Sequence, residues 1–155
     1  MDRKDLLNLL LEKDLTLSCM ESLTAGLFAA SFTSVPGASN VFLGGGITYN
    51  NDVKKAFGIK PEIINTYGAI SKECADEMAL QCAFFFKSDI AISFTGNAGP
   101  SAEEDKTVGL VFISIKLKDT LYSYKLNLKG EREDIRRQCV DFAFNKIYTL
   151  VKENA

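Results

Sequence analysis

Apolar residues recur along this chain with two periods, one typical of helices and one typical of strands. In residues 1–14, several leucines fall at helical spacing between polar side chains, which predicts an amphipathic helix with one buried stripe. The same pattern, bounded by capping residues, glycines and prolines, returns further along the chain. The expected helices are 2–13, 23–35, 52–57, 61–68, 71–86 and 130–152, with Asn51 as the cap of the third.

Five shorter segments have the length and apolar character of strands. The segment 89–94 is continuously apolar, which predicts a central strand covered on both faces. The last two segments alternate and are separated by a turn near Lys118 and Asp119, which predicts a hairpin. The expected strands are 15–20, 41–49, 89–94, 108–116 and 120–128.

Helices that alternate with apolar strands indicate an α/β protein. We expect a three-layer α/β/α sandwich with a mixed, mostly parallel sheet, in which the late hairpin supplies the antiparallel part. No repeat, linker or low-complexity segment interrupts this order, so residues 1–155 are expected to form one domain. Phe84, Phe85 and Phe86 are assigned to core or interface packing.

Composition narrows the classes of partner. The formal charge is -2 with a pI near 5.2 and no dense basic block, which argues against nucleic acid. No apolar run approaches the roughly 20 residues needed to span a bilayer. The N-terminal segment lacks a signal-peptide pattern, so a cytoplasmic protein without membrane contact is expected. The four cysteines are scattered and are expected to be reduced and mostly buried.

The chain contains no histidine, which removes the commonest general base and the commonest metal ligand. Histidine-dependent triads are therefore excluded within the chain, and a lysine or a carboxylate must act as base in any covalent chemistry. The phosphate-binding P-loop and dinucleotide fingerprints are also missing from the sequence, and no cofactor is expected.

Two loops carry candidate binding groups. The polar turn with Ser22 and Thr24 follows the first strand and precedes a helix, an arrangement that can bind an anion; alternatively, Ser22 or its neighbour Glu21 only caps that helix. The loop 95–100 follows the central strand and is a second candidate edge of the same pocket. The acidic stretch 101–105 is expected to be a solvated, mobile loop.

Arginines near the start of the last helix are unexpected, because a cation there opposes the helix dipole. The sequence places Arg132, Arg136 and Arg137 in this region. We therefore expect one of the three to face an anionic ligand.

Ser39 and Lys54 are the candidate pair for nucleophilic chemistry, because a desolvated lysine can take a proton from a serine. They lie at the two ends of the segment 41–49. The alternative, which residue type alone favours, is that Ser39 is only a turn or cap residue. A cysteine nucleophile fits poorly, because each cysteine falls inside a predicted helix or strand.

Taken together, these loops resemble the C-terminal domain family of the competence-damage-inducible protein CinA, whose members include nicotinamide mononucleotide deamidase. The resemblance covers about residues 15–140. The matching motifs are E-S-x-T-x-G at 21–26, P-G-A-S at 36–39, G-G-I-T-Y-N at 45–50 with Lys54, G-A-I-S at 68–71, T-G-x-A-G-P at 95–100, K-x-V-G at 106–109 and G-E-R-x-x-I-R at 130–136.

The resemblance implies a metal-independent amidohydrolase that converts nicotinamide mononucleotide to nicotinate mononucleotide and ammonia. By this analogy, Ser39 is the nucleophile, Lys54 is its base, and Tyr49 assists. The implied substrate-binding residues are Ser22, Thr24, Gly46, Thr95, Gly96 and Arg136, of which the last would meet the phosphate.

Two other classes of function remain open from the sequence. Ala25 stands where this family usually has glycine, which motivates a non-catalytic nucleotide-binding module of the same fold. A structural interaction domain that uses the phenylalanine-rich helix is the third. A homo-oligomer such as a dimer is expected.

Overall fold

A five-stranded sheet forms the centre of the molecule, in a computed structural model that describes residues 2–154. The strands are β1 (Leu17–Glu21), β2 (Phe42–Ile47), β3 (Ile90–Gly96), β4 (Leu110–Leu117) and β5 (Thr120–Asn127), in the spatial order β2-β1-β3-β4-β5. β1 pairs in parallel with β2 and β3, whereas β4 pairs antiparallel with β3 and β5. Only β4 therefore runs against the other strands, which confirms the mixed sheet, the late hairpin and the central position of β3.

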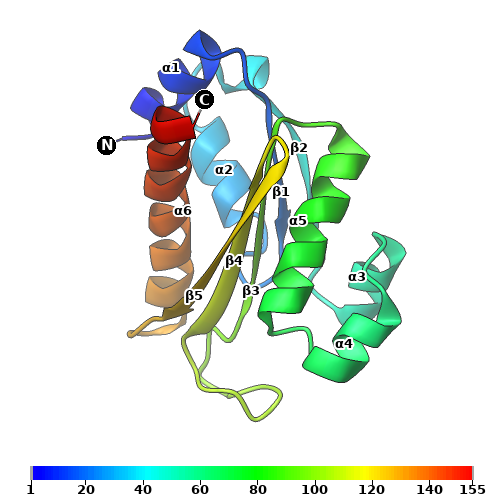
Figure 1. The fold of residues 1–155 in the computed structure, drawn as a ribbon. Helices are drawn as coiled ribbons and strands as arrows, with labels where there is room; N and C mark the ends of the chain where they lie inside the picture. The colour runs from blue at the N-terminus through cyan, green and yellow to red at the C-terminus, as the bar shows by residue number, and fades with distance from the viewer. Residues whose placement is uncertain (1, 155) are drawn as a thin grey trace.

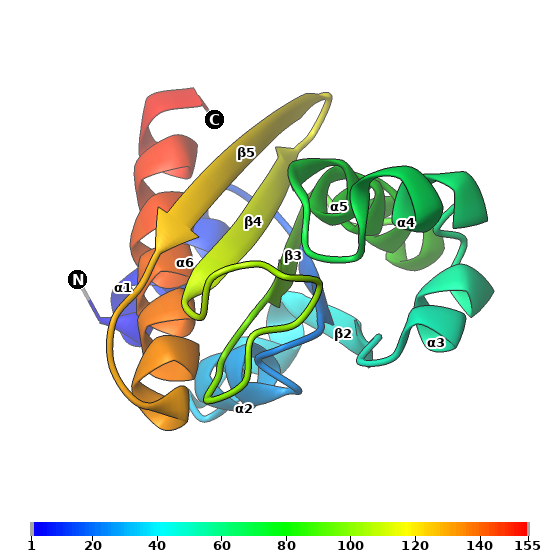
Figure 2. The same cartoon turned by 90° about the horizontal axis from the view of Figure 1, so that it is seen from below.

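Helices cover both faces of this sheet (Figures 1 and 2). The helices are α1 (Arg3–Glu12), α2 (Leu27–Thr33), α3 (Asn51–Ala56), α4 (Pro61–Tyr67), α5 (Lys72–Phe86) and α6 (Arg132–Asn154), with a 3-10 turn at Ala38–Asn40. α1, α2 and α6 pack on one face, and α4 and α5 with the nearby α3 lie on the other. The three-layer sandwich expected from the sequence is thereby confirmed.

Within residues 2–154, no helix has both the length and the apolar character required to cross a membrane.

Three aromatic rings join the elements of the larger core. Phe28 of α2 is fully buried, and its ring centroid lies 5.4 Å from that of Phe94 in β3 and 5.1 Å from that of Phe144 in α6. Aromatic contacts at this spacing contribute about 0.5–1.5 kcal/mol beyond their area burial. This cluster fixes α2, and the turn that precedes it, against the central strand.

The end of α5 differs from the expectation of core packing. Phe84 and Phe85 are 81% and 65% exposed, because they fall on the outer side of the helix. Only Phe86 packs against the buried cluster beneath α5. The core assignment is wrong for the first two residues, and association with another molecule through them stays a prediction.

The consecutive glycines of β2 allow close packing on both faces of this strand. A Cβ atom at Gly45 would lie 2.5 Å from Cys19 Sγ, and one at Gly44 would lie 2.9 Å from a ring carbon of Phe86. The pairing of β1 with β2 also shifts register between Leu17 and Ser18, as at a β-bulge. β2 therefore has an irregular pairing with β1 and glycines that leave no room for a side chain.

Gly45→Ala is expected to destabilise the fold by about 1–3 kcal/mol, because the added methyl group would overlap Cys19 and force β1 and β2 apart. Urea unfolding of the variant and of the wild type measures this difference. Ser39→Ala, an exposed substitution outside the strands, is the control and is expected to change stability by less than about 0.5 kcal/mol. Unchanged stability of Gly45→Ala would contradict the packing described here.

Candidate active site

The carboxyl ends of the three neighbouring parallel strands bring a serine and a lysine together. Ser22 follows β1 directly, and Lys54 lies in α3, which follows β2. The Lys54 ammonium nitrogen donates hydrogen bonds to Ser22 Oγ at 3.1 Å and to the Tyr49 carbonyl at 3.1 Å. These two contacts join the turn after β1 to the connection between β2 and α3.

Lys54 is a buried lysine that has no ion-pair partner among the described residues. The residue is only 2% exposed, and no salt bridge within residues 2–154 involves it. Burial lowers the pKa of its ammonium group, because a desolvated cation is penalised, and the more distant carboxylates of Glu104 and Glu103 oppose this shift only in part. A lysine in this state can give up its proton and then act as a base.

The Ser22 turn is fixed by its neighbour Glu21. The carboxylate of this 1% exposed residue accepts the backbone N–H groups of Phe28 at 3.0 Å and Ala29 at 3.1 Å, which caps the start of α2. The Ser22 N–H donates to the Phe94 carbonyl at 3.0 Å, continuing the pairing of β1 with β3. Of the two capping residues considered from the sequence, Glu21 performs this role and leaves the Ser22 hydroxyl free to meet Lys54.

The position of Lys54 depends on the start of α3. Asn50 caps this helix, since its side chain accepts the Val53 N–H at 3.1 Å, whereas Asn51 is the first helical residue. The expected cap was thus wrong by one position. With Asn50 as the cap, Lys54 lies one turn into the helix and reaches back toward β1.

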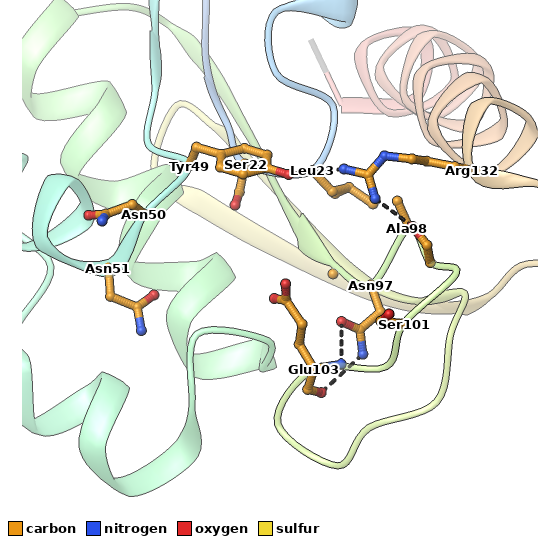
Figure 3. Close-up of a pocket in the computed structure, with 12 residues that line it drawn as sticks. Ser22, Leu23, Tyr49, Asn50, Asn51, Asn97, Ala98, Ser101, Glu103 and Arg132 are labelled. Carbon is orange, nitrogen blue, oxygen red and sulfur yellow. Dashed lines mark hydrogen bonds between the residues drawn. The ribbon is translucent and has the colours of Figure 1, made fainter.

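A cleft of about 410 Å³ opens beside Ser22 (Figure 3). Its lining comes from Ser22 and Leu23, residues 49–51, residues 96–99, Ser101, Glu103 and Arg132. The volume falls within the range of about 300–1,000 Å³ typical of small-molecule sites. Ser22 lines the cleft, whereas buried Lys54 does not, so a ligand in the cleft would meet the serine first.

Arg132, and not Arg136, is the arginine that faces the cleft. Its guanidinium donates to the Gly99 carbonyl and, at 3.0 Å, to the Tyr49 hydroxyl (Figure 3). Arg136, one helical turn later, donates to the Thr24 carbonyl at 3.0 Å and to Glu133 at 2.6 Å. The cation expected to meet an anion is therefore Arg132, and Arg136 holds the Ser22 turn in place.

Ser39 is not part of this site. It lies exposed in the 3-10 turn that precedes β2, whereas Lys54 follows the other end of that strand. A six-residue strand is about 20 Å long at roughly 3.3 Å per residue, which is too far for proton transfer. The predicted pair of Ser39 with Lys54 is thus replaced by Ser22 with Lys54.

Other predicted binding residues have structural contacts. Thr95 is 1% exposed and donates to the Ala69 carbonyl at 2.8 Å, so it joins β3 to the segment before α5. Thr24 is fully buried, and its hydroxyl has no hydrogen-bond partner among residues 2–154. Gly46 makes room for Phe57, whose ring would lie 3.0 Å from an added Cβ. Of the predicted binding glycines, only Gly96 lines the cleft.

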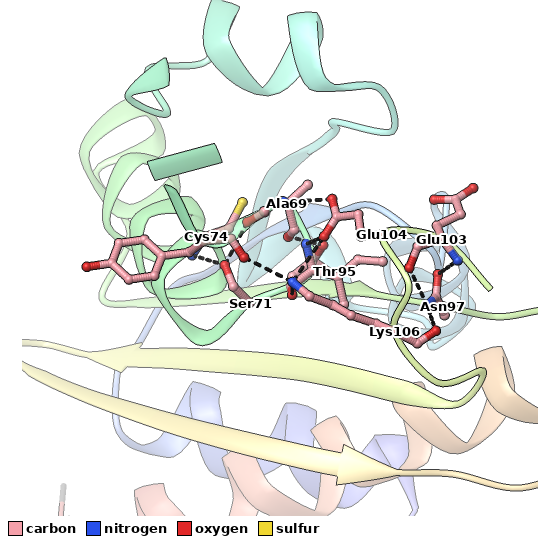
Figure 4. A network of polar contacts seen from close by, with 11 residues as sticks. Ala69, Ser71, Cys74, Thr95, Asn97, Glu103, Glu104 and Lys106 are labelled. Atoms are coloured by element: carbon pink, nitrogen blue, oxygen red, sulfur yellow. Dashed lines mark hydrogen bonds and ion pairs between the residues drawn. The ribbon is translucent and has the colours of Figure 1, made fainter. Parts of the chain in front are cut away.

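The acidic loop after β3 is tied down at two points (Figure 4). Asn97 donates to the carbonyls of Glu103 at 3.1 Å and Lys106 at 2.9 Å, and it accepts the Glu103 N–H at 3.1 Å. Glu104 accepts the N–H groups of Ala69 at 2.9 Å and Ile70 at 3.1 Å, and Lys106 pairs with it. The loop is solvated as predicted, but these polar contacts fix its course.

The cysteines do not offer a second nucleophile. All four are buried. Burial raises the pKa of Cys74 to about 11 and that of Cys82 and Cys139 to about 12, and it raises the pKa of Cys19 as well. The thiols therefore stay protonated near neutral pH.

Residues 2–154 contain no cluster of three or more Cys, Asp or Glu side chains placed to hold a metal ion.

Two comparisons of sequence identify relatives of the chain. The model of the CinA C-terminal domain matches residues 2–151. A Bacillus cereus protein named "Putative competence-damage inducible protein" is 44% identical over 149 residues, covering 95% of this chain and 36% of the relative. A Bacillus thuringiensis protein of the same name has the same identity and coverage. The chain thus spans about a third of the length of these curated relatives.

Solved structures share the fold. A competence/damage inducible protein from Agrobacterium tumefaciens superposes with a TM-score of 0.88 at 30% identity, over 97% of this chain and 96% of that one. A CinA superfamily protein from Escherichia coli gives a TM-score of 0.92 at 26% identity, over 96% and 87%. The arrangement of the sheet and helices is therefore one already found in this superfamily.

Replacing Lys54 by methionine is expected to stabilise the protein at pH 7 by about 1–3 kcal/mol, because it removes a buried cation that has no charged partner. In the wild type, the folded state loses the Lys54 proton at a lower pH than the unfolded state does. Stability therefore rises with pH between the lowered pKa and the ordinary value of 10.5.

The stability advantage of Lys54→Met is thus expected to shrink across that same pH window, as measured by urea unfolding at several pH values. Lys55→Met, at the adjacent and more exposed lysine, is the matched control and is expected to show no such trend. A Lys54→Met protein that is less stable than the wild type at every pH would contradict the account of the buried ammonium group.

Proposed function

The chain belongs to the CinA C-terminal domain family, and on that premise we propose that it is a serine amidase acting on the carboxamide of nicotinamide mononucleotide. The products are nicotinate mononucleotide and ammonia. The observation that carries the proposal is the contact of buried Lys54 with the Oγ atom of Ser22, which lines a ligand-sized cleft. A buried lysine beside a serine is the arrangement that activates a hydroxyl where no histidine exists.

In the first half of the proposed reaction, neutral Lys54 takes the proton from Ser22 Oγ as the oxygen attacks the carboxamide carbon. The C–N bond then breaks, and the Lys54 ammonium gives its proton to the departing nitrogen, which leaves as ammonia. The product of this half is an ester between Ser22 and the nicotinoyl group. Dividing amide hydrolysis in this way replaces one difficult step by two easier ones.

In the second half, a water molecule replaces ammonia in the cleft. Lys54 takes a proton from this water, whose oxygen attacks the ester carbon. The ester C–O bond breaks, and the proton returns from Lys54 to Ser22 Oγ. The carboxylic acid is released, and the serine and lysine return to their starting states, so a single base serves both halves of the reaction.

Two backbone N–H groups are suited to stabilise the negative oxygen of the intermediates. Leu23 follows the proposed nucleophile directly, and Ala98 lies in the loop after β3, and both residues line the cleft. Neither N–H donates a hydrogen bond to another residue in the range 2–154. Such unpaired donors beside a nucleophile are typical of an oxyanion hole.

The substrate phosphate is assigned to Arg132. Its guanidinium lies at the cleft wall beside the Tyr49 hydroxyl, and both groups can donate hydrogen bonds to phosphate oxygens. Arg136 is committed to Thr24 and Glu133, so it does not compete for this role. The assignment also explains why an arginine stands at the start of α6, where it opposes the helix dipole.

Ser22→Ala is expected to lower the rate of ammonia release from nicotinamide mononucleotide by at least about 10³-fold, because the attacking oxygen is lost. A coupled ammonia assay with a chelator present measures this and tests the metal independence at the same time. Ser39→Ala is the matched control and is expected to keep the activity within about twofold, because Ser39 lies at the opposite end of β2.

Loss of activity in Ser39→Ala alone would overturn the assignment of the nucleophile. A wild type that binds the mononucleotide but releases no ammonia over a broad pH range would favour the non-catalytic nucleotide-binding module. Ala25, which motivates that alternative, is exposed and outside the cleft lining, with φ at 46°.

Arg132→Gln is expected to lower kcat/KM for nicotinamide mononucleotide by about 10–100-fold through loss of the charged phosphate contact. With nicotinamide riboside, which lacks the phosphate, the same substitution is expected to change kcat/KM by less than about threefold. Steady-state kinetics on both substrates separates these effects. Equal losses on the two substrates would show that Arg132 supports the cleft without binding phosphate.

A further inference from the structure

The two walls of the cleft carry opposite charges. Arg132 lies on the wall formed by α6, and Glu103 lies on the wall formed by the loop after β3 (Figure 3). We propose that the Glu103 carboxylate is the counter-ion of a cationic aromatic ring held over Ser22, so that this site selects a pyridinium carboxamide over a neutral one. This inference rests on the proposed function and assigns the ring-recognition group of that same site.

The Glu103 carboxylate is free to take this role. The side chain extends from the loop toward the Ser22 side of the cleft (Figure 3). Within residues 2–154 it forms no salt bridge, and the hydrogen bonds of Glu103 all come from its backbone. A carboxylate in a ligand-sized cleft without a cation of the protein is available to a cation of the ligand.

The backbone on both sides of Glu103 is fixed. Asn97, which is 2% exposed, holds the Glu103 N–H and carbonyl at 3.1 Å each. The next residue, Glu104, is bound to the N–H groups of Ala69 and Ile70 (Figure 4). Only the side chain of Glu103 therefore has to order on binding, which reduces the entropic cost of a specific contact.

The charges of the cleft match those of the proposed substrate. In nicotinamide mononucleotide, the pyridinium ring is positive and the phosphate is negative, and the ribose separates them. The ring carries the carboxamide, so a carbonyl placed at Ser22 brings the positive ring to the Glu103 wall. The phosphate then extends toward the Arg132 wall. Such complementarity between the charges of a ligand and of its site contributes more to selectivity than to affinity.

The test compares two ligands of the same shape that differ in ring charge. Nicotinamide mononucleotide has a pyridinium ring, and 3-carbamoylphenyl ribose 5′-phosphate, its carbon-linked analogue, has a neutral and equally planar one. Dissociation constants are measured by calorimetry with the full chain carrying Ser22→Ala, which prevents turnover. We expect the pyridinium ligand to bind about tenfold tighter, and Glu103→Gln to remove this preference by weakening that ligand alone.

Asp105→Asn is the matched control, because it removes the same charge from the same loop at a residue that does not line the cleft. Asparagine also tolerates the φ of 55° at this position. The control is expected to keep the tenfold preference, and 0.5 M salt is expected to reduce the preference in the parent protein by screening.

An unchanged preference in Glu103→Gln, or an equal loss for both ligands, would overturn the role of Glu103 as counter-ion. The proposed function is checked separately by ammonia release from the protein with Ser22 intact. If the protein hydrolyses nicotinamide mononucleotide but Glu103→Gln keeps the preference for the pyridinium ligand, only the counter-ion role of Glu103 is contradicted. If neither nucleotide binds, both proposals are contradicted.

Discussion

The burial of one lysine is the constraint on which the site depends. Lys54 is 2% exposed and is held by two neutral oxygens, the Ser22 hydroxyl and the Tyr49 carbonyl. A cation in such surroundings costs stability, and the cost appears as a lowered pKa of the ammonium group. The same desolvation that lowers the stability of the fold therefore lowers the pKa of a base that contacts Ser22. Residues of active sites commonly reduce the stability of a protein in this way.

The remaining polar groups of the site serve to hold its loops. Glu21 fixes the Ser22 turn to α2, Arg136 fixes it to α6, and Asn97 with Glu104 fixes the loop on the other side of the cleft. Each of these side chains bonds to backbone groups of another segment, so the loops keep their course without regular structure. Chemistry at the ends of parallel strands depends on such support, because a displacement of about 1 Å can cost a large part of the rate.

The fold was predictable from the sequence because its elements carry strong local signals. The continuous apolar run of β3, the alternating hairpin of β4 and β5 and the helical stripes of α1 and α5 each identify one element. The loops at the strand ends were also recognisable by their glycines and polar residues. Ser22, Tyr49 and Gly96 from these loops line the cleft, and Lys54 of α3 contacts Ser22.

The pairing of residues within the site could not be predicted. Ser22 and Lys54 are 32 positions apart, and they meet because β1 inserts between β2 and β3, which is a property of the topology. Ser39 is closer to Lys54 in sequence but lies at the wrong end of β2. Arg132 and Arg136 differ by one helical turn, and only the packing of α6 decides which one faces the cleft. The number of residues that separates two positions in the sequence predicts none of these contacts.

The identity of the acylated residue during turnover tests the central claim most directly. The methyl ester of nicotinate mononucleotide has a better leaving group than the amide, so its acyl-enzyme is expected to accumulate. After acid quench, peptide mass spectrometry is expected to find the nicotinoyl nucleotide on Ser22, and to find none in protein carrying Lys54→Ala. An adduct on Ser39, or an unmodified protein that still hydrolyses the ester, would contradict the account of Ser22 activated by buried Lys54.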